Sequence, residues 1–165
     1  MIIGAIEAGG TKFICGLGDE KGNVLEKVSF PTTTPEETMK QVIKYFKDKK
    51  FDAMGIGSFG PINPIKSTEK YGYILKTPKA HWSNYDILGE LKKHFDVPME
   101  FDTDVNGAAL AESWIGAGEG LKNVMYITVG TGIGAGAVVD GKMLHGLSHP
   151  EMGHINVKRH SQDNY

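Results

Sequence analysis

Two glycine-threonine turns carry the clearest chemical signal in the sequence, because each follows an apolar run that reads as a β-strand. The residues of the two turns are Gly9, Gly10, Thr11 and Lys12 in the first, and Gly130, Thr131 and Gly132 in the second. Glycine removes the side-chain bulk that would hold a phosphate away from backbone N–H groups, and threonine adds a hydroxyl. The pair predicts a site that grips a triphosphate from two sides, although each turn alone also fits a plain tight hairpin.

Asp104 is the best candidate for bond chemistry, because it stands where an apolar strand ends and a helix begins. At such a place one carboxylate oxygen can cap the helix while the other faces a cleft. A hydroxyl that accepts a phosphoryl group needs a base positioned in this way. By position alone, an aspartate that only caps the helix explains the residue equally well.

Residues 128–135 also satisfy the glycine-x-glycine-x-x-alanine fingerprint of dinucleotide-binding folds. That fingerprint must open a helix, whereas residues 135–141 are typical of a strand followed by a turn. Nicotinamide binding is therefore kept as a minor alternative. The observation that decides it is whether the residues after Gly134 form a helix or a strand.

A cluster of histidines near the end of the sequence raises the question of a metal. Its members are His145, His149, His154 and His160. Glycine and proline interrupt the stretch, so no helical spacing puts two of the histidines on one face, and their spacing alone makes zinc the less favoured interpretation. Glu151 in the same stretch also has a plain interpretation as a solvated surface acid.

Strands and helices that alternate along the chain must position these residues. Strands are predicted at 1–6, 13–17, 24–30, 51–58 and 97–101, with a short one possible at 73–75, and helices at 34–50, 83–95 and 104–114. Residues 116–120 form the best linker. After it, the order strand, glycine turn, strand, Asp-to-Gly turn, strand repeats over residues 123–144, which predicts two similar halves facing each other. We expect a piece of a longer two-domain protein.

Composition limits the possible partners. The 165 residues carry 18 basic and 20 acidic side chains, for a net charge of −2, and no basic block, so a nucleic-acid partner is not expected. No run approaches the ~18 apolar residues that cross a membrane. A single cysteine, Cys15, and the lack of a secretory signal at the start predict a cytoplasmic protein with a small-molecule partner.

Several motifs occur together and in order along the whole chain. They span residues 7–12, 57–61, 101–109, 128–134 and 149–155. Together they resemble the ROK family of sugar kinases and repressors, and within it the bacterial fructokinases. The resemblance implies an α/β fold of the actin-like, sugar-kinase ATPase type. Its ribonuclease H-like first domain, a mixed sheet with helices, would span 1–117, and an incomplete second, nucleotide domain would span 118–165.

The resemblance also implies an activity and its cofactors. ATP, Mg²⁺ and a hexose would meet between the domains, with fructose phosphorylated on its 6-hydroxyl and a structural Zn²⁺ in the complete protein. We expect the 165-residue chain alone to be inactive, and a sugar-binding module without catalysis is the alternative. A homodimer is implied, while the repressor branch is not expected, because its DNA-binding domain precedes the first turn and here that turn starts at residue 7.

Individual residues acquire roles through the same resemblance. Asp104 matches the general base, and the two glycine turns match the phosphate loops. The positions that shape or contact the sugar pocket correspond to Gly60, Pro61, Asn106, Glu151 and His154. His154 also matches the first zinc ligand, with the cysteine ligands expected beyond Tyr165. Many members carry aspartate at Glu7, which leaves its part in magnesium binding open.

Overall fold

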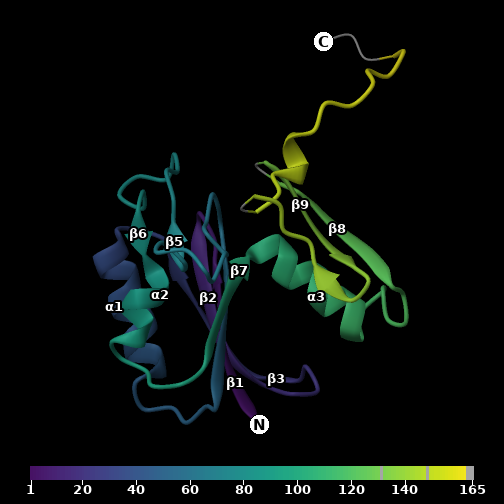
Figure 1. Ribbon diagram of the computed structural model, residues 1–165. Helices are drawn as coiled ribbons and strands as arrows, with labels where there is room; N and C mark the ends of the chain where they lie inside the picture. Colours follow the sequence, from purple (N-terminus) through teal and green to yellow (C-terminus); the bar gives the residue numbers. More distant parts are fainter. Residues whose placement is uncertain (131, 148, 163–165) are drawn as a thin grey trace.

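A mixed five-stranded sheet forms the centre of the computed structural model, which describes residues 1–130, 132–147 and 149–162 (Figure 1). Its strands, in the order β3-β2-β1-β4-β7, are β1 (Ile2–Ala8), β2 (Lys12–Asp19), β3 (Val24–Pro31), β4 (Ala53–Ser58) and β7 (Met99–Thr103). β1, β2 and β3 make an antiparallel meander, whereas β4 and β7 run parallel to β1. This arrangement confirms the predicted mixed sheet.

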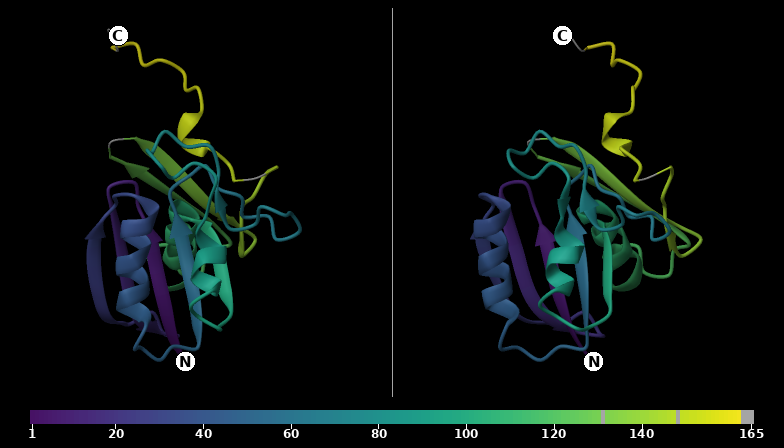
Figure 2. Two further views of the ribbon diagram at one scale, coloured as in Figure 1. Left: turned by 90° about the vertical axis from the view of Figure 1, so that its left-hand side faces the viewer. Right: turned by 60° about the vertical axis from the view of Figure 1, so that its left-hand side comes forward.

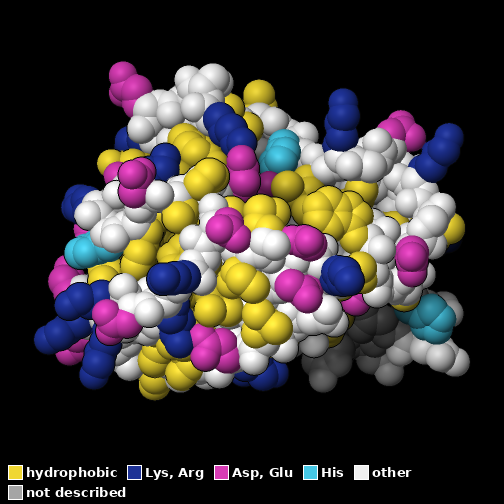
Figure 3. Space-filling view, turned by 90° about the horizontal axis from the view of Figure 1, so that it is seen from below, with side chains coloured by type: hydrophobic (Ala, Val, Ile, Leu, Met, Phe, Trp, Pro, Cys, Tyr) yellow, Lys and Arg dark blue, Asp and Glu magenta, His cyan; other side chains and the backbone are white. Residues whose placement is uncertain are grey.

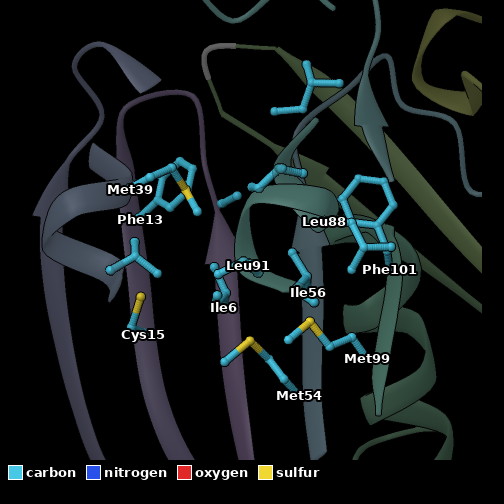
Figure 4. Close-up of a cluster of buried hydrophobic side chains, with 14 of the residues drawn as sticks. Ile6, Phe13, Cys15, Met39, Met54, Ile56, Leu88, Leu91, Met99 and Phe101 are labelled. Atoms are coloured by element: carbon cyan, nitrogen blue, oxygen red, sulfur yellow. The ribbon is translucent and has the colours of Figure 1, made fainter. Parts of the chain in front are cut away.

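Helices α1 (Pro35–Phe46) and α2 (Ile87–Lys92) cover one face of this sheet (Figures 1 and 2). α1 begins as predicted, because the Thr34 hydroxyl accepts a hydrogen bond from the N–H of Glu37 and proline occupies the first helical position. It ends at Phe46 rather than near residue 50. Its buried residues face the sheet across a continuous hydrophobic core (Figure 4).

The segment predicted as a helix over 83–95 is instead a short strand followed by a short helix. β6 (Tyr85–Asp86) pairs with β5 (Tyr73–Ile74), and α2 starts only after Asp86, whose Oδ1 accepts from the N–H of Gly89 at 2.7 Å. Asn84 has a φ of 59°, which a helix does not allow. The fully buried Trp82 just before it donates from Nε1 to the Thr33 carbonyl, so tertiary packing fixes this irregular entry.

Helix α3 (Asp104–Ile115) lies between the large sheet and a three-stranded antiparallel sheet (Figure 1). The strands of that second sheet are β8 (Asn123–Val129), β9 (Ile133–Val139) and β10 (Lys142–Met143). Its β10-β9-β8 meander has the same order as β3-β2-β1, which confirms the repeat read from the sequence. Because residues after Gly134 form a strand rather than a helix, the nicotinamide alternative loses its structural basis.

Apolar side chains remain open on the outer part of this second sheet. Met125, Ile127 and Val129 of β8 are 61%, 58% and 76% exposed. A space-filling view from below shows further hydrophobic side chains lying between acidic ones (Figure 3). After β10 the chain passes through a short 3₁₀ helix, η1 (Met152–His154).

Within the described ranges, no helix combines the length and the apolar character needed to cross a membrane.

Candidate active site

The candidate catalytic residues leave the large sheet at a single edge. Ala8, Ser58 and Thr103 lie side by side in the register of the parallel strands β1, β4 and β7. The first glycine turn follows Ala8, and Asp104 follows Thr103, so both emerge at the carboxyl ends of neighbouring strands. This is the edge at which open α/β sheets bind their ligands.

Asp104 is the first residue of α3 and not its cap, which corrects the expectation by one position. Thr103 has an extended backbone, and its hydroxyl accepts a hydrogen bond from the N–H of Asn106 at 3.1 Å. The Asp104 carboxylate is therefore not needed to cap the helix. Its Oδ1 accepts instead from the adjacent Val105 N–H at 2.9 Å, which orients the group at the helix N-terminus.

A cavity of about 400 Å³ opens beside Asp104, between the large sheet edge and the second sheet. The predicted site residues on its wall are Gly60, Asp104, Gly132 and Glu151. These residues come from the loop after β4, the start of α3, the β8–β9 turn and the segment before η1. Residues far apart in the sequence thus meet around one cavity, and two of them, Asp104 and Glu151, carry carboxylates.

The environment of Asp104 raises the pKa of its carboxyl group above the ordinary value. Burial is the largest cause, because it disfavours the charged form, and the negative charge of Glu7 acts in the same direction. The hydrogen bond from Val105 and the nearby His149 oppose the shift. A carboxylate with a raised pKa is a better proton acceptor near neutral pH, as a general base requires.

His149 also lines this cavity, although the sequence assigned it no role in the sugar or phosphate site. Its side chain is 6% exposed, and Nε2 lies 2.9 Å from Oε1 of Glu151. Nδ1 lies 3.1 Å from the carbonyl oxygen of Ile62, in the loop after β4. A Cβ atom on Gly60 would lie 3.1 Å from Nε2, so the bare glycine lets the ring approach. His149 thereby holds Glu151 against this loop.

The first glycine turn is closed by a hydrogen bond from the Gly9 N–H to the Lys12 carbonyl at 3.0 Å. A Cβ atom on Gly9 would lie 2.6 Å from that carbonyl oxygen, so the turn requires glycine there. Gly10 at the tip has open space around it, and Lys12 already begins β2. The open tip is compatible with a phosphate against its backbone, but the turn is not among the residues on the cavity wall, and its phosphate contact stays a prediction.

The second turn presents Gly132 to the cavity, and the Gly130 N–H donates to the Gly132 carbonyl at 2.9 Å. A Cβ atom at either glycine would meet nothing within 4 Å. Thr131, the third predicted member of this turn, lies outside the described residues. The open backbone fits the expected phosphate contact, which stays a prediction.

Comparison with known proteins identifies the fold and the family. The family model described as the ROK family matches residues 3–164. The chain belongs to the ROK family. It is 48% identical over 165 residues to a fructokinase of Pediococcus pentosaceus, covering 100% of this chain and 57% of that protein. A fructokinase of Lactococcus lactis subsp. cremoris is 48% identical over 157 residues, covering 95% of this chain and 53% of that protein.

A solved ROK structure supports the same placement. The ROK glucokinase of Streptomyces griseus, in complex with glucose and AMPPNP, has a TM-score of 0.82 and 28% identity, and the match covers 96% of this chain and 51% of that one. The mixed sheet with its helices therefore has the actin-like fold of ROK sugar kinases. The ROK chain described here spans about half the length of the curated relatives it matches.

Three predicted sugar-pocket residues of the ROK chain lie off the described wall of the cavity: Pro61, Asn106 and His154. Pro61 follows Gly60 directly, so it borders the wall. Asn106 is only 1% exposed, and its amide is engaged with other protein groups. His154 is exposed in η1 and donates its backbone N–H to the Glu151 carbonyl at 3.0 Å. Their sugar contacts stay predictions.

The part of the ROK chain that the structure describes does not contain a complete set of zinc ligands. No group of three or more His, Cys, Asp or Glu side chains gathers there in a geometry that could hold a metal ion. A structural zinc needs four ligands in a tetrahedral arrangement. The described residues alone therefore do not fit the ion, and His154 as a ligand stays a prediction.

Proposed function

We propose that the complete protein is an ATP-dependent hexose kinase, and specifically a fructokinase that phosphorylates the 6-hydroxyl of fructose. The observation that carries the proposal is the position of Asp104, a carboxyl group with a raised pKa, on one cavity wall with Gly132 and Glu151. The fructokinase relatives, at 48% identity over nearly the whole chain, support the choice of sugar.

The proposed chemistry is a single phosphoryl transfer. The Asp104 carboxylate accepts the proton of the sugar hydroxyl as that oxygen forms a bond to the γ-phosphorus. The bond from the γ-phosphorus to the bridging oxygen breaks, ADP leaves, and Asp104 later returns its proton to solvent. Such catalysis is mostly positioning and electrostatic stabilisation, because the transferred group needs little covalent help from the protein.

The remaining predicted residues bind and orient the two substrates in this proposal. Backbone N–H groups of the turns at 9–12 and 130–132 hold the phosphates of ATP. The Gly60–Pro61 loop and Glu151, braced by His149, shape the sugar side of the cavity. Asn106 and His154 were predicted to share this role, and the buried amide of Asn106 instead suggests a supporting one.

The proposal includes two metal ions, one that binds with ATP and one that is structural. Mg²⁺, when bound with ATP, would neutralise charge on the phosphates. Glu7 is the acidic residue at the end of β1, and its charge already acts on Asp104. A structural Zn²⁺ is proposed only for the complete protein, with His154 as its first ligand. No step of the reaction depends on zinc.

The proposed domain organisation assigns residues 1–117 to the first domain and 118–165 to the start of the second. The exposed apolar residues of β8 support this division, because a sheet face of this kind is normally covered within a complete domain. A sugar kinase consumes ATP and therefore belongs in the cytoplasm, with small molecules as its partners. We also propose a homodimer, without nucleic-acid or membrane partners.

The test is an ADP-release assay on the complete protein with ATP and, in turn, fructose, glucose and mannose. The proposal predicts sugar-dependent ADP release with the highest kcat/KM for fructose. Fructose binding in calorimetry without ADP release would instead establish the non-catalytic sugar-binding module. The 165-residue chain, assayed in parallel, is expected to release no ADP, because the matches cover only 57% and 53% of the two fructokinases.

A further inference from the structure

We infer that His145, Asp102 and Asn106 form a positioning network that fixes the first turn of α3 and, through it, the direction of the Asp104 carboxylate. The inference rests on the proposed function, in which Asp104 is the base. In this network His145 orients Asp102 and is not considered as a metal ligand, and Asn106 supports the backbone and does not contact the sugar.

The Asp102 carboxylate is the centre of the network. Asp102 is the residue before the Thr103 cap, and it is 9% exposed. Its Oδ2 lies 2.6 Å from Nε2 of His145, which must donate because a carboxylate only accepts. Its Oδ1 accepts from the Thr103 N–H at 2.7 Å and from Nδ2 of Asn106 at 2.9 Å. Both oxygens are thus satisfied, as a nearly buried carboxylate requires.

Asn106 connects this centre to the second sheet. Its Nδ2 also donates to the Leu144 carbonyl at 3.3 Å, and its Oδ1 accepts from the Ala137 N–H of β9 at 3.3 Å. Leu144 directly precedes His145, so the segment after β10 is held by two neighbouring contacts. With both amide hydrogens engaged and a residue exposure of 1%, Asn106 has little left to offer a sugar.

The network acts on the backbone that carries Asp104. Asp102 holds the N–H of Thr103, and the Thr103 hydroxyl holds the N–H of Asn106. Asp104 lies between these two fixed points, so the direction of its Cα–Cβ bond follows from them. A reacting group displaced by about 1 Å can lose on the order of 10²-fold in rate.

His145 itself lies away from the proposed reaction. It lines a different cavity, of about 390 Å³, together with Asp102 and Leu110, and is not among the described residues on the wall beside Asp104. We therefore expect His145 to make no contact with a sugar bound next to Asp104. Its effect on turnover must pass through Asp102, which defines a positioning residue.

The kinetic test uses the complete protein with His145→Ala and His145→Gln. Glutamine can place an N–H close to where Nε2 of histidine lies, and so restores the donor to Asp102. We expect His145→Ala to lower kcat by about 10-fold or more, because a small displacement of a reacting group costs that much in rate, with the KM values for ATP and fructose nearly unchanged. His145→Gln should recover most of that loss.

A matched control comes from the turn that follows α2. His94 in this turn also lies against a carboxylate, with Nε2 3.4 Å from Oε1 of Glu90 in α2, but α2 covers the other face of the sheet from α3 (Figure 1). His94→Ala should leave kcat unchanged. A His145→Ala variant with wild-type kcat, or a His145→Gln variant as slow as His145→Ala, would overturn the inference.

A second measurement separates this inference from the proposed function. Hydrogen exchange of the peptide that contains residues 103–107 should be faster in His145→Ala than in wild type, and normal in His145→Gln and His94→Ala. If the wild-type protein lacks kinase activity but the exchange follows this pattern, the proposed function fails and the network stands. If wild type is an active kinase and exchange is equal in all variants, the network fails alone.

Discussion

Gly136 of β9 lies so close to Val105 of α3 that a Cβ atom on the glycine would stand 2.2 Å from the Val105 carbonyl oxygen. The carbonyl of Val105 belongs to the backbone of α3, and a Cβ atom is fixed to the backbone of β9. Neither atom can therefore move aside as the end of a flexible side chain would. Gly136→Ala should therefore push α3 away from the second sheet and lower the free energy of unfolding by about 1–3 kcal/mol, the usual cost of overpacking. Urea unfolding of the 165-residue chain measures this loss.

Gly107 provides the matched control for this substitution. It lies within α3 and a Cβ atom there would meet nothing within 4 Å. Gly107→Ala should raise the unfolding free energy by up to about 1 kcal/mol, because alanine favours the helix. If both alanine variants shift the urea midpoint in the same direction, the close approach of α3 to β9 is not what limits stability.

The raised pKa of Asp104 predicts a pH-dependent effect on stability. A carboxyl group with a higher pKa in the folded state binds its proton more tightly there than in the unfolded chain. The cost of burying its charge is therefore complete above the folded pKa, and it disappears as the pH falls below the unfolded value of about 3.9. Asp104→Asn should stabilise the chain at pH 7 and give a smaller gain at pH 4.

Urea midpoints of wild type and variant at the two pH values test this expectation. Asp96→Asn serves as the control, since Asp96 is exposed. A gain for Asp104→Asn that grows toward pH 4, or one matched by Asp96→Asn, would speak against a carboxylate destabilised by burial.

The brace between His149 and Glu151 predicts a selective effect on sugar binding. His149→Ala removes a hydrogen bond to a charged group and frees the loop at Ile62. Because the Glu151 side chain is 54% exposed, this bond contributes only about 1 kcal/mol, and the KM for fructose in the complete protein should rise by about 3- to 10-fold. The KM for ATP should change little. Initial rates at varied fructose and fixed ATP provide the measurement, and an unchanged KM for fructose would contradict the brace.

Much of the fold could be predicted because its signals are local. Thr34 and Pro35 begin α1 in the expected way, and the two glycine turns separate apolar runs that do form hairpins. The segment around Trp82 could not be predicted in this way. Its form depends on the bond from Trp82 to Thr33 and on the pairing of β5 with β6, both of which join residues distant in sequence.

In the candidate site, too, residues with a local sequence signal could be predicted, whereas those placed by distant contacts could not. Asp104 and Glu151 stand in motifs that can be recognised, and the structure brings them to one cavity. Thr103 and Asp104 are both good capping residues, so only the backbone geometry decides that Thr103 is the cap. His149 was missed as a cavity residue because its partner Ile62 is 87 positions away. No local pattern carries such a contact.

The most direct test of Asp104 as the general base is the turnover of the complete protein carrying Asp104→Asn, with saturating ATP and fructose. Asparagine keeps the shape and the contact with Val105 but cannot accept the proton. We predict a kcat about 10²- to 10⁴-fold below wild type, the usual contribution of general base catalysis, with ATP affinity nearly unchanged. A variant that turns over within about twofold of wild type would contradict the assignment.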